Sequence, residues 1–98
     1  MAGWTFITNH GAVLVVISQN NRITAREIAA QLGITERSVQ RIIMDLEDGG
    51  YISKQREGRV NRYEINRGKP LRRKEAREVS VGDLIEVLSP APKKTKKA

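Results

Sequence analysis

Apolar side chains recur along the chain with two different periods, and the change falls at Gly50. Before it, Ile28 and Leu32 are four residues apart, which is the spacing of one edge of an α-helix. A second stripe follows the i, i+3, i+4, i+7 pattern and consists of Val39, Ile42, Ile43 and Leu46. After Gly50 the period falls to two, the period of a β-strand. The pattern therefore predicts two short helices followed by strands.

Residues that cap and separate helices stand around these two stripes. Thr24 and Glu27 have the spacing of a capping box, and Thr35 is a natural cap for the second helix. Gly33 lies between the helices, where its tolerance of positive φ permits a sharp turn. Gly49-Gly50 suits a left-handed cap at the end of the second helix. We therefore expect two separate helices joined by a tight turn.

The segment from Thr24 to Gly50 has the order of a helix-turn-helix: a helix, a small residue, a glycine turn and an amphipathic helix. Ala29, Gly33 and Val39 stand at the offsets of that motif. A helix-turn-helix inserts its second helix into the DNA major groove. A helical hairpin from a small bundle would contain the same turn. The segment that follows the second helix therefore decides between a helix-turn-helix and a helical hairpin.

That segment, YISKQREGRVNRYEIN, is predicted to be a β-hairpin. Ser53–Arg56 and Val60–Ile65 are the expected strands, and Glu57-Gly58-Arg59 is the turn. On the second strand, one face carries Asn61, Tyr63 and Ile65, and the other carries Val60, Arg62 and Glu64. A hairpin directly after the second helix, with basic residues at its tip, corresponds to a wing.

The layout from Trp4 to Ile65 resembles the winged helix-turn-helix transcriptional regulators of prokaryotes, broadly the MarR-like and ArsR-like groups. The most specific stretches are TERSVQRIIMDLEDGGYI and REGRVNRYEI. The resemblance implies a recognition helix in the major groove and a wing on the DNA backbone or in the adjacent minor groove. MarR-like regulators usually have long dimerisation helices around an effector pocket, and ArsR-like regulators often sense metals through cysteines. The chain is too short for the former and contains no cysteine, so only DNA binding is carried over.

The region before the motif is predicted to be the first helix, from Trp4 to Asn21, with Asn9 as its cap. Its valines and isoleucine favour a strand, but a helix-turn-helix needs a third helix to cover its apolar side. Because the apolar run from Ala12 to Ile17 leaves this helix apolar on nearly all sides, we expect it to be covered on more than one side. Arg22–Thr24 is a link that can form a small strand.

The region after the hairpin is expected to contain a basic linker and a short helix. Residues Arg67–Arg77 include Pro70 and suit an irregular surface segment. Ser80 and Asp83 form a second capping box, and the helix that begins at Val81 is stopped by Pro90. The fold class is therefore α+β: a winged helix-turn-helix of three helices and a two- or three-stranded wing sheet, with a short extra C-terminal helix. The expected divisions are 1–66 for the DNA-binding domain, 67–89 for linker and helix, and 90–98 for a disordered basic tail.

Charge and composition narrow the range of possible functions. The net charge is +7, and residues 52–77 alone hold ten basic and three acidic side chains. Positive charge thus follows the helix-turn-helix, where a nucleic acid backbone would lie. The chain has no cysteine, no nucleophile beside a base and no phosphate-cradling glycine loop, so we expect a non-enzyme without a cofactor or metal. His10, the single histidine, suits a surface or capping role. With no span or signal segment, the expected location is the cytoplasm, on the nucleoid.

The expected DNA contacts come from two elements. With its apolar stripe facing inward, the second helix exposes Arg37, Gln40 and Arg41, which suit guanine or adenine edges. The recognition-helix candidates are Thr35, Glu36, Arg37, Ser38, Gln40 and Arg41, and the wing or backbone candidates are Lys54, Arg56, Arg59, Asn61 and Arg62. Among the wing candidates, Arg59, beside the Gly58 turn, is the one expected to reach into the minor groove. The alternative for Arg37 is an ion pair within its own helix.

We expect a homodimer, because prokaryotic helix-turn-helix proteins commonly bind two half-sites. The dimerisation candidates are Trp4, Phe6, Val81, Leu84, Ile85 and Leu88. The alternative is that these residues cover their own domain. For function, the rivals to a sequence-specific regulator are a winged helix that binds protein, an RNA or single-stranded DNA-binding protein, and a non-specific nucleic-acid-coating protein. No motif indicates an operator, an effector or the direction of regulation.

Overall fold

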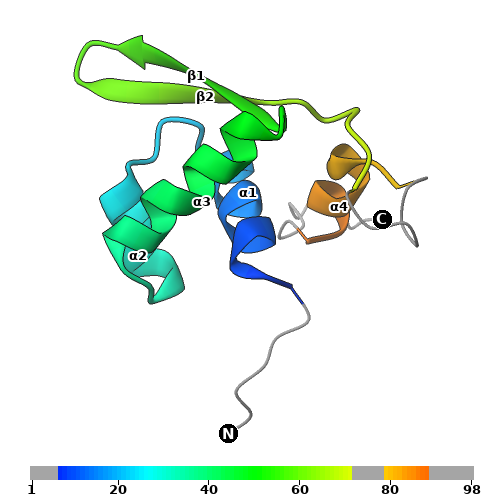
Figure 1. Cartoon of the computed structure of the whole chain (residues 1–98), viewed down its shortest axis with the longest axis horizontal. Coiled ribbons are helices and arrows are strands. Elements are labelled where there is room, and N and C mark those ends of the chain that lie inside the picture. Colours follow the sequence, from blue (N-terminus) through cyan, green and yellow to red (C-terminus); the bar gives the residue numbers. More distant parts are fainter. Residues whose placement is uncertain (1–6, 72–78, 89–98) are drawn as a thin grey trace, which may run out of the picture.

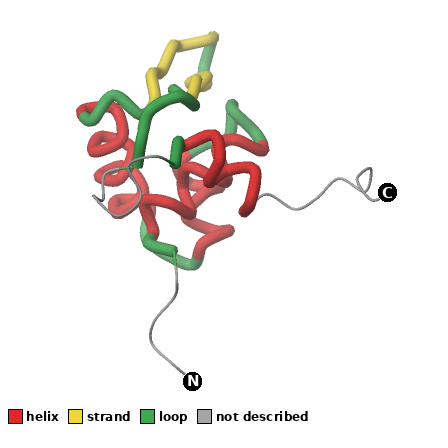
Figure 2. Tube along the Cα trace, turned by 90° about the vertical axis from the view of Figure 1, so that its right-hand side faces the viewer, coloured by secondary structure: helices red, strands yellow, loops and turns green. Residues whose placement is uncertain are grey.

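The structure is a computed structural model that describes residues 7–71 and 79–88. Within these residues the chain forms helices packed together and a hairpin that projects from them (Figures 1 and 2). The elements are α1 (Asn9–Gln19), α2 (Ala25–Leu32), α3 (Glu36–Asp48), β1 (Ile52–Glu57), β2 (Val60–Ile65) and α4 (Val81–Leu88). The predicted α+β winged helix-turn-helix with an extra C-terminal helix is confirmed.

The first helix, α1, is shorter than predicted. It begins at Asn9, and its cap is Thr8, whose side chain accepts a hydrogen bond from the N–H of Gly11. The prediction of Asn9 as the cap is therefore wrong, and Trp4 lies outside the described residues. The helix forms despite its β-branched content because its side chains are covered on several sides. It packs against α2, α3, α4 and β2, and Val13, Leu14, Val16 and Ile17 are buried.

The helix-turn-helix forms through the predicted local contacts. Thr24 and Glu27 make both hydrogen bonds of the capping box at the start of α2. Gly33 has φ of 70°, a left-handed conformation that L side chains disfavour. The side chain of Thr35 caps α3 by accepting from the N–H of Ser38. At the other end the left-handed residue is Gly50, with φ of 81°. The stripe of Val39, Ile42, Ile43 and Leu46 is buried as predicted.

The wing is an antiparallel hairpin whose register runs from Ile52 opposite Ile65 to Glu57 opposite Val60. Both strands reach the two-residue loop Gly58-Arg59, so β1 is longer at each end than the predicted Ser53–Arg56. Within the described residues the sheet has two strands. The small strand suggested for Arg22–Thr24 is not formed. Instead, the N–H of Tyr63 donates to the carbonyl oxygen of Asn21 at 2.9 Å, which fixes the loop before α2 to the hairpin.

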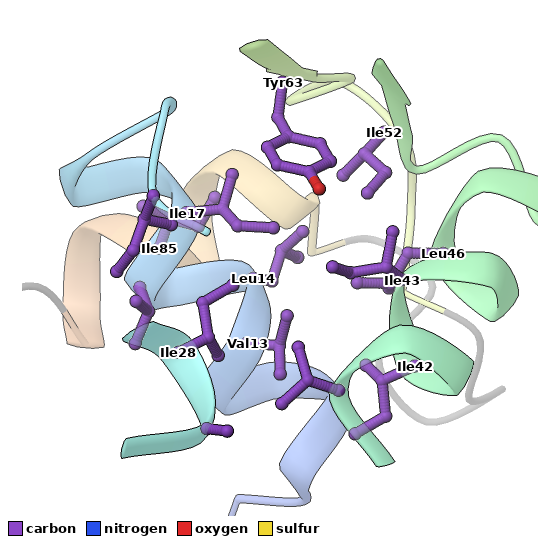
Figure 3. Packing of buried hydrophobic residues seen from close by; sticks show 14 of the residues in the cluster. Val13, Leu14, Ile17, Ile28, Ile42, Ile43, Leu46, Ile52, Tyr63 and Ile85 are labelled. Atoms are coloured by element: carbon purple, nitrogen blue, oxygen red, sulfur yellow. The ribbon is translucent and has the colours of Figure 1, made fainter. Parts of the chain in front are cut away.

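One apolar core joins all these elements (Figure 3). Tyr63 and Ile52 from the hairpin lie over the side chains of α1 and α3, so the base of the wing belongs to the core. The second capping box, between Ser80 and Asp83, forms as predicted and begins α4. Val81 and Ile85 of α4 are buried, at 1% and 3% exposure. The C-terminal helix therefore covers its own domain.

This placement bears on the dimerisation candidates. Val81 and Ile85 lie in the core of their own chain, so they present no surface to a second copy. Leu84 and Leu88 are half-buried and keep part of their surface exposed. Trp4 and Phe6 lie outside the described residues, as does Pro90. Residues 67–71 have no regular element beyond an isolated bridge between Pro70 and Ser80, and the rest of the predicted linker to residue 77 is not described.

Candidate nucleic-acid interface

The outward face of α3 is polar and open. Arg37, Gln40, Arg41 and Met44 follow the i, i+3, i+4, i+7 pattern on the side of α3 opposite its buried stripe, and all four are exposed. Among the described residues, neither Arg37 nor Arg41 forms an ion pair, so the alternative of an ion pair within the helix is not observed for Arg37. Two guanidinium groups one helical turn apart are thus available to a ligand.

The N-terminal turn of α3 is held by its own side chains. Thr35 Oγ1 accepts from the Ser38 N–H at 3.0 Å and donates to Ser38 Oγ at 2.9 Å. Both hydroxyl groups are therefore engaged in capping, although both residues are exposed. Glu36 is exposed in the first turn, where its negative charge interacts favourably with the helix dipole. The cap orients the turn from which Arg37 projects.

The predicted wing residues fall into different environments. Arg59 is exposed in the loop, and the described residues offer it no hydrogen-bond or ion-pair partner. The Nε of Arg56 donates to the carbonyl oxygen of Gly58 at 3.0 Å, which turns Arg56 back onto the tip. Lys54 Nζ lies 3.7 Å from Glu47 Oε1 at the end of α3, and Asn61 is half-buried. Arg59 at the tip is therefore available to a ligand, and Lys54, within the part of the chain that is described, is held only by its long contact with Glu47.

All three guanidinium nitrogens of Arg62 donate hydrogen bonds to side chains of the hairpin. Its Nε donates to Glu57 at 2.7 Å, Nη1 to Glu64 at 2.9 Å and Nη2 to Gln55 at 3.0 Å. Hydrogen bonds to Glu64 and Glu57 raise the pKa of Arg62 above its ordinary value. The hydrogen bond from Arg62, followed by one from Arg22, lowers the pKa of Glu57. Arg62 was predicted to contact phosphate, but its three nitrogens already have acceptors.

Arg22 is a participant that sequence reasoning missed. It precedes α2, and its Nε donates to Glu57 Oε1 at 3.0 Å across 35 positions of sequence. No local spacing signals such a contact. The same is true of His10, predicted to have a surface or capping role, which bonds through Nε2 to Asp45 of α3 at 2.8 Å on the surface.

A cleft of about 430 Å³ lies between α3 and the face of the hairpin that carries Lys54, Asn61 and Tyr63. Its walls include Gln40, Met44 and Glu47 of α3 and Lys54, Arg59 and Asn61 of the hairpin. Tyr63 lines it too, and burial raises the pKa of its phenol. The cleft therefore brings the basic side chains of Lys54 and Arg59 on the hairpin together with Gln40 of α3.

No group of three His, Cys, Asp or Glu residues in the described ranges has the geometry to hold a metal ion. Over the same residues, no helix has both the length and the apolar content required to cross a bilayer.

Comparison with known proteins fits this geometry. Residues 8–53 match the family model described as winged helix-turn-helix DNA-binding. These residues, a little under half of the chain, are thus similar to winged helix-turn-helix DNA-binding domains. The matched region runs from the cap of α1 into β1 and contains all of α2 and α3. In this fold α3 is the second helix of the helix-turn-helix, and the β1–β2 hairpin is the wing.

Individual relatives support the same fold. The uncharacterized protein MJ1254 of Methanocaldococcus jannaschii is 35% identical over 63 residues, which are 63% of this chain and 13% of that protein. Among solved structures, the zinc-responsive MarR family member ZitR of Lactococcus lactis has a TM-score of 0.56 at 15% identity, covering 87% of this chain and 52% of that one. T. potens IscR has a TM-score of 0.54 at 22% identity, covering 90% and 63%. The winged helix-turn-helix chain thus spans only part of each relative.

Proposed function

We propose that this protein binds duplex DNA in a sequence-specific way and regulates transcription. In this proposal α3 enters the major groove, where Arg37, Gln40 and Arg41 contact base edges, and Thr35, Glu36 and Ser38 form its leading turn. Arg59 of the wing contacts the backbone or the adjacent minor groove. The protein acts on the nucleoid in the cytoplasm. The two solved relatives named above support the fold, and the family match supports DNA as the ligand.

The observation that carries the proposal is the pair of unpaired guanidinium groups on the exposed face of α3. A helix that served only as scaffold would gain from pairing its arginines with neighbouring carboxylates. Arg37 and Arg41 instead lie exposed without an ion pair among the described residues. A bidentate bond from either to guanine would contribute about 1–3 kcal/mol of discrimination against a wrong base.

The proposal includes a homodimer, because a helix-turn-helix dimer binds two half-sites and so doubles its contacts. The half-buried Leu84 and Leu88 of α4, with Trp4 and Phe6, are the candidate contacts. Sedimentation of the purified chain over a range of concentrations tests this part. A monomer at all concentrations, free and on DNA, would contradict it.

Selection of random duplexes by the purified chain tests the main proposal. We expect an enriched inverted repeat with half-site centres about one helical turn apart. A monomer would enrich a single half-site. Uniform recovery of all sequences would contradict sequence-specific regulation and favour a non-specific coating protein. Failure to retain any duplex, even at low salt, would contradict DNA binding altogether.

A further inference from the structure

The wing has two chemically different faces. Because side chains alternate along a strand, Ser53, Gln55 and Glu57 of β1 share one face with Val60, Arg62 and Glu64 of β2. The other face carries Lys54, Arg56, Asn61 and Tyr63, and three of these residues line the cleft against α3. We call the first the outer face and the second the inner face.

On the outer face, positive and negative groups satisfy one another. Arg62 donates to Glu57, Glu64 and Gln55, and Glu57 also accepts from Arg22. Two arginines thus face two glutamates, so the network is neutral as a unit. Its contact distances of 2.7–3.0 Å are those of charge-assisted hydrogen bonds. Such a face offers a phosphate little net attraction.

The same network reaches from the hairpin to the helix-turn-helix. Arg22 lies in the loop that leads into α2, whereas Glu57 is the last residue of β1 before the tip. Lower on the hairpin, the bond from the Tyr63 N–H to the Asn21 carbonyl oxygen fixes the same loop to β2. Two attachments at different heights hold a hairpin more firmly than one, because a single attachment leaves it free to pivot.

We propose that Glu57 and Arg62 are positioning residues that hold the wing against the α1–α2 loop through Arg22, and that the wing contacts DNA phosphates only with its tip and inner face, through Arg59 and Lys54. This inference rests on the proposed function and reassigns Arg62 from a phosphate contact to an internal partner. Without the network the part of the hairpin near its tip would have to be ordered at the moment of binding, at an entropic cost.

Salt dependence separates the two roles. The probe is a mixed-sequence duplex of about 30 base pairs, long enough for two half-sites one turn apart. Arg59→Gln and Arg62→Gln remove the same charge from the same hairpin, so they are matched variants. We expect Arg59→Gln to lower the slope of log K against log salt by about 0.9, the value for one phosphate contact. Arg62→Gln should leave the slope unchanged while weakening binding about threefold to tenfold. An equal drop in slope for Arg62→Gln would overturn the inference.

Removing an acidic residue provides a second test, in which the expected change in DNA affinity is opposite to the change expected from charge alone. Glu57→Gln deletes a negative charge, which on charge alone should strengthen attraction to DNA. We expect the opposite, because the wing loses its attachment to Arg22 and Arg62: binding about threefold to tenfold weaker. The control is Glu86→Gln on α4, an exposed carboxylate for which the described residues show no ion pair. It should bind as well as the parent or better. Equal or tighter binding by Glu57→Gln would refute the positioning role.

Amide hydrogen exchange in the free protein keeps this test independent of DNA binding. Exchange in β1 and β2 should be faster in Glu57→Gln and Arg62→Gln than in the parent, and unchanged in Arg59→Gln. The exchange of α1 and α3 should be unaffected, which shows that the fold is intact. If hairpin exchange is the same in all four proteins, the network does not hold the wing. If the parent shows no salt-dependent duplex affinity, the proposed function fails while this arm still reports on the network.

Discussion

Arg41 and Arg59 are both exposed arginines, yet their positions give them different expected contributions. Arg41 lies on the face of a helix with Arg37 and Gln40, a geometry suited to the edges of bases. Arg59 lies in the hairpin loop beside Gly58, where in the proposed complex its partner would be the sugar-phosphate backbone. Specificity and general affinity are thus expected to reside in different elements.

We expect Arg41→Ala to reduce discrimination between the selected duplex and single-base variants by about 1–3 kcal/mol. Arg59→Ala should weaken binding to all of these duplexes by a similar factor, since it removes a contact that carries no sequence information. Equilibrium titration of each variant against the same panel of duplexes measures both effects. If both variants keep the parent's affinities across the panel, the face of α3 and the tip of the wing are wrongly assigned.

Burial separates the residues that stabilise the fold from those available to a ligand. Ile17, in the last turn of α1, is 0% exposed, whereas Met44 on α3 is 60% exposed. Ile17→Ala should lower the free energy of unfolding by about 2–5 kcal/mol, because it leaves a cavity in the core. Met44→Ala should change it by less than about 0.5 kcal/mol. Urea unfolding gives both values, and comparable losses would mean that the core is not where the structure has it.

At the scale of elements, the hairpin depends on one backbone conformation. Gly58 has φ of 62°, and a Cβ built on it would have no neighbour within 4 Å. Any cost of Gly58→Ala is therefore backbone strain, about 1–2 kcal/mol for an L residue in the left-handed region. Gly68 has equal space around its Cα without a positive φ, so Gly68→Ala is the matched control. Thermal unfolding should show a lower midpoint for Gly58→Ala alone. A similar change in both variants would contradict the assigned turn.

The ionic network of the wing predicts a pH dependence. Hydrogen bonds from Arg62 and Arg22 lower the pKa of Glu57 in the folded chain. A carboxyl group with a lowered pKa stabilises the fold above its ordinary pKa, and this contribution is lost as the pH falls through the folded value. Glu57→Gln should therefore be less stable than the parent at neutral pH, with the difference shrinking in acid. Urea unfolding at a series of pH values measures this, and a difference that grows on acidification would exclude the mechanism.

At the scale of the whole molecule, α4 closes the domain and the wing extends it. Val81 and Ile85 add α4 to the core beside α1, so the C-terminal helix belongs to the folded unit. The hairpin projects at another side of the molecule (Figures 1 and 2), and residues of the hairpin and of α3 line a common cleft. The region of similarity makes up 13% of MJ1254, which is therefore a much longer protein than this chain.

Much of this arrangement was predictable because its causes are local. The capping boxes at Thr24 and Ser80 join residues three apart, and Gly33 forms its turn through its own backbone. The change in period after Gly50 likewise marks the end of α3 and the start of the wing. Short-range spacing determines such features, so the sequence alone was enough for the helix-turn-helix, the hairpin and the exposed Arg37 and Arg41.

Contacts between residues far apart in the chain were decided only by the tertiary structure. The true extent of α1 was decided by packing, because its composition favoured a strand. Arg22 meets Glu57 across 35 positions, and this contact, with Arg62, turns an expected phosphate ligand into part of an internal network. Whether α4 covered its own core or a partner also depended on where the preceding chain brought it. No residue spacing encodes these outcomes, since each depends on which surfaces meet once the helices and the hairpin have packed.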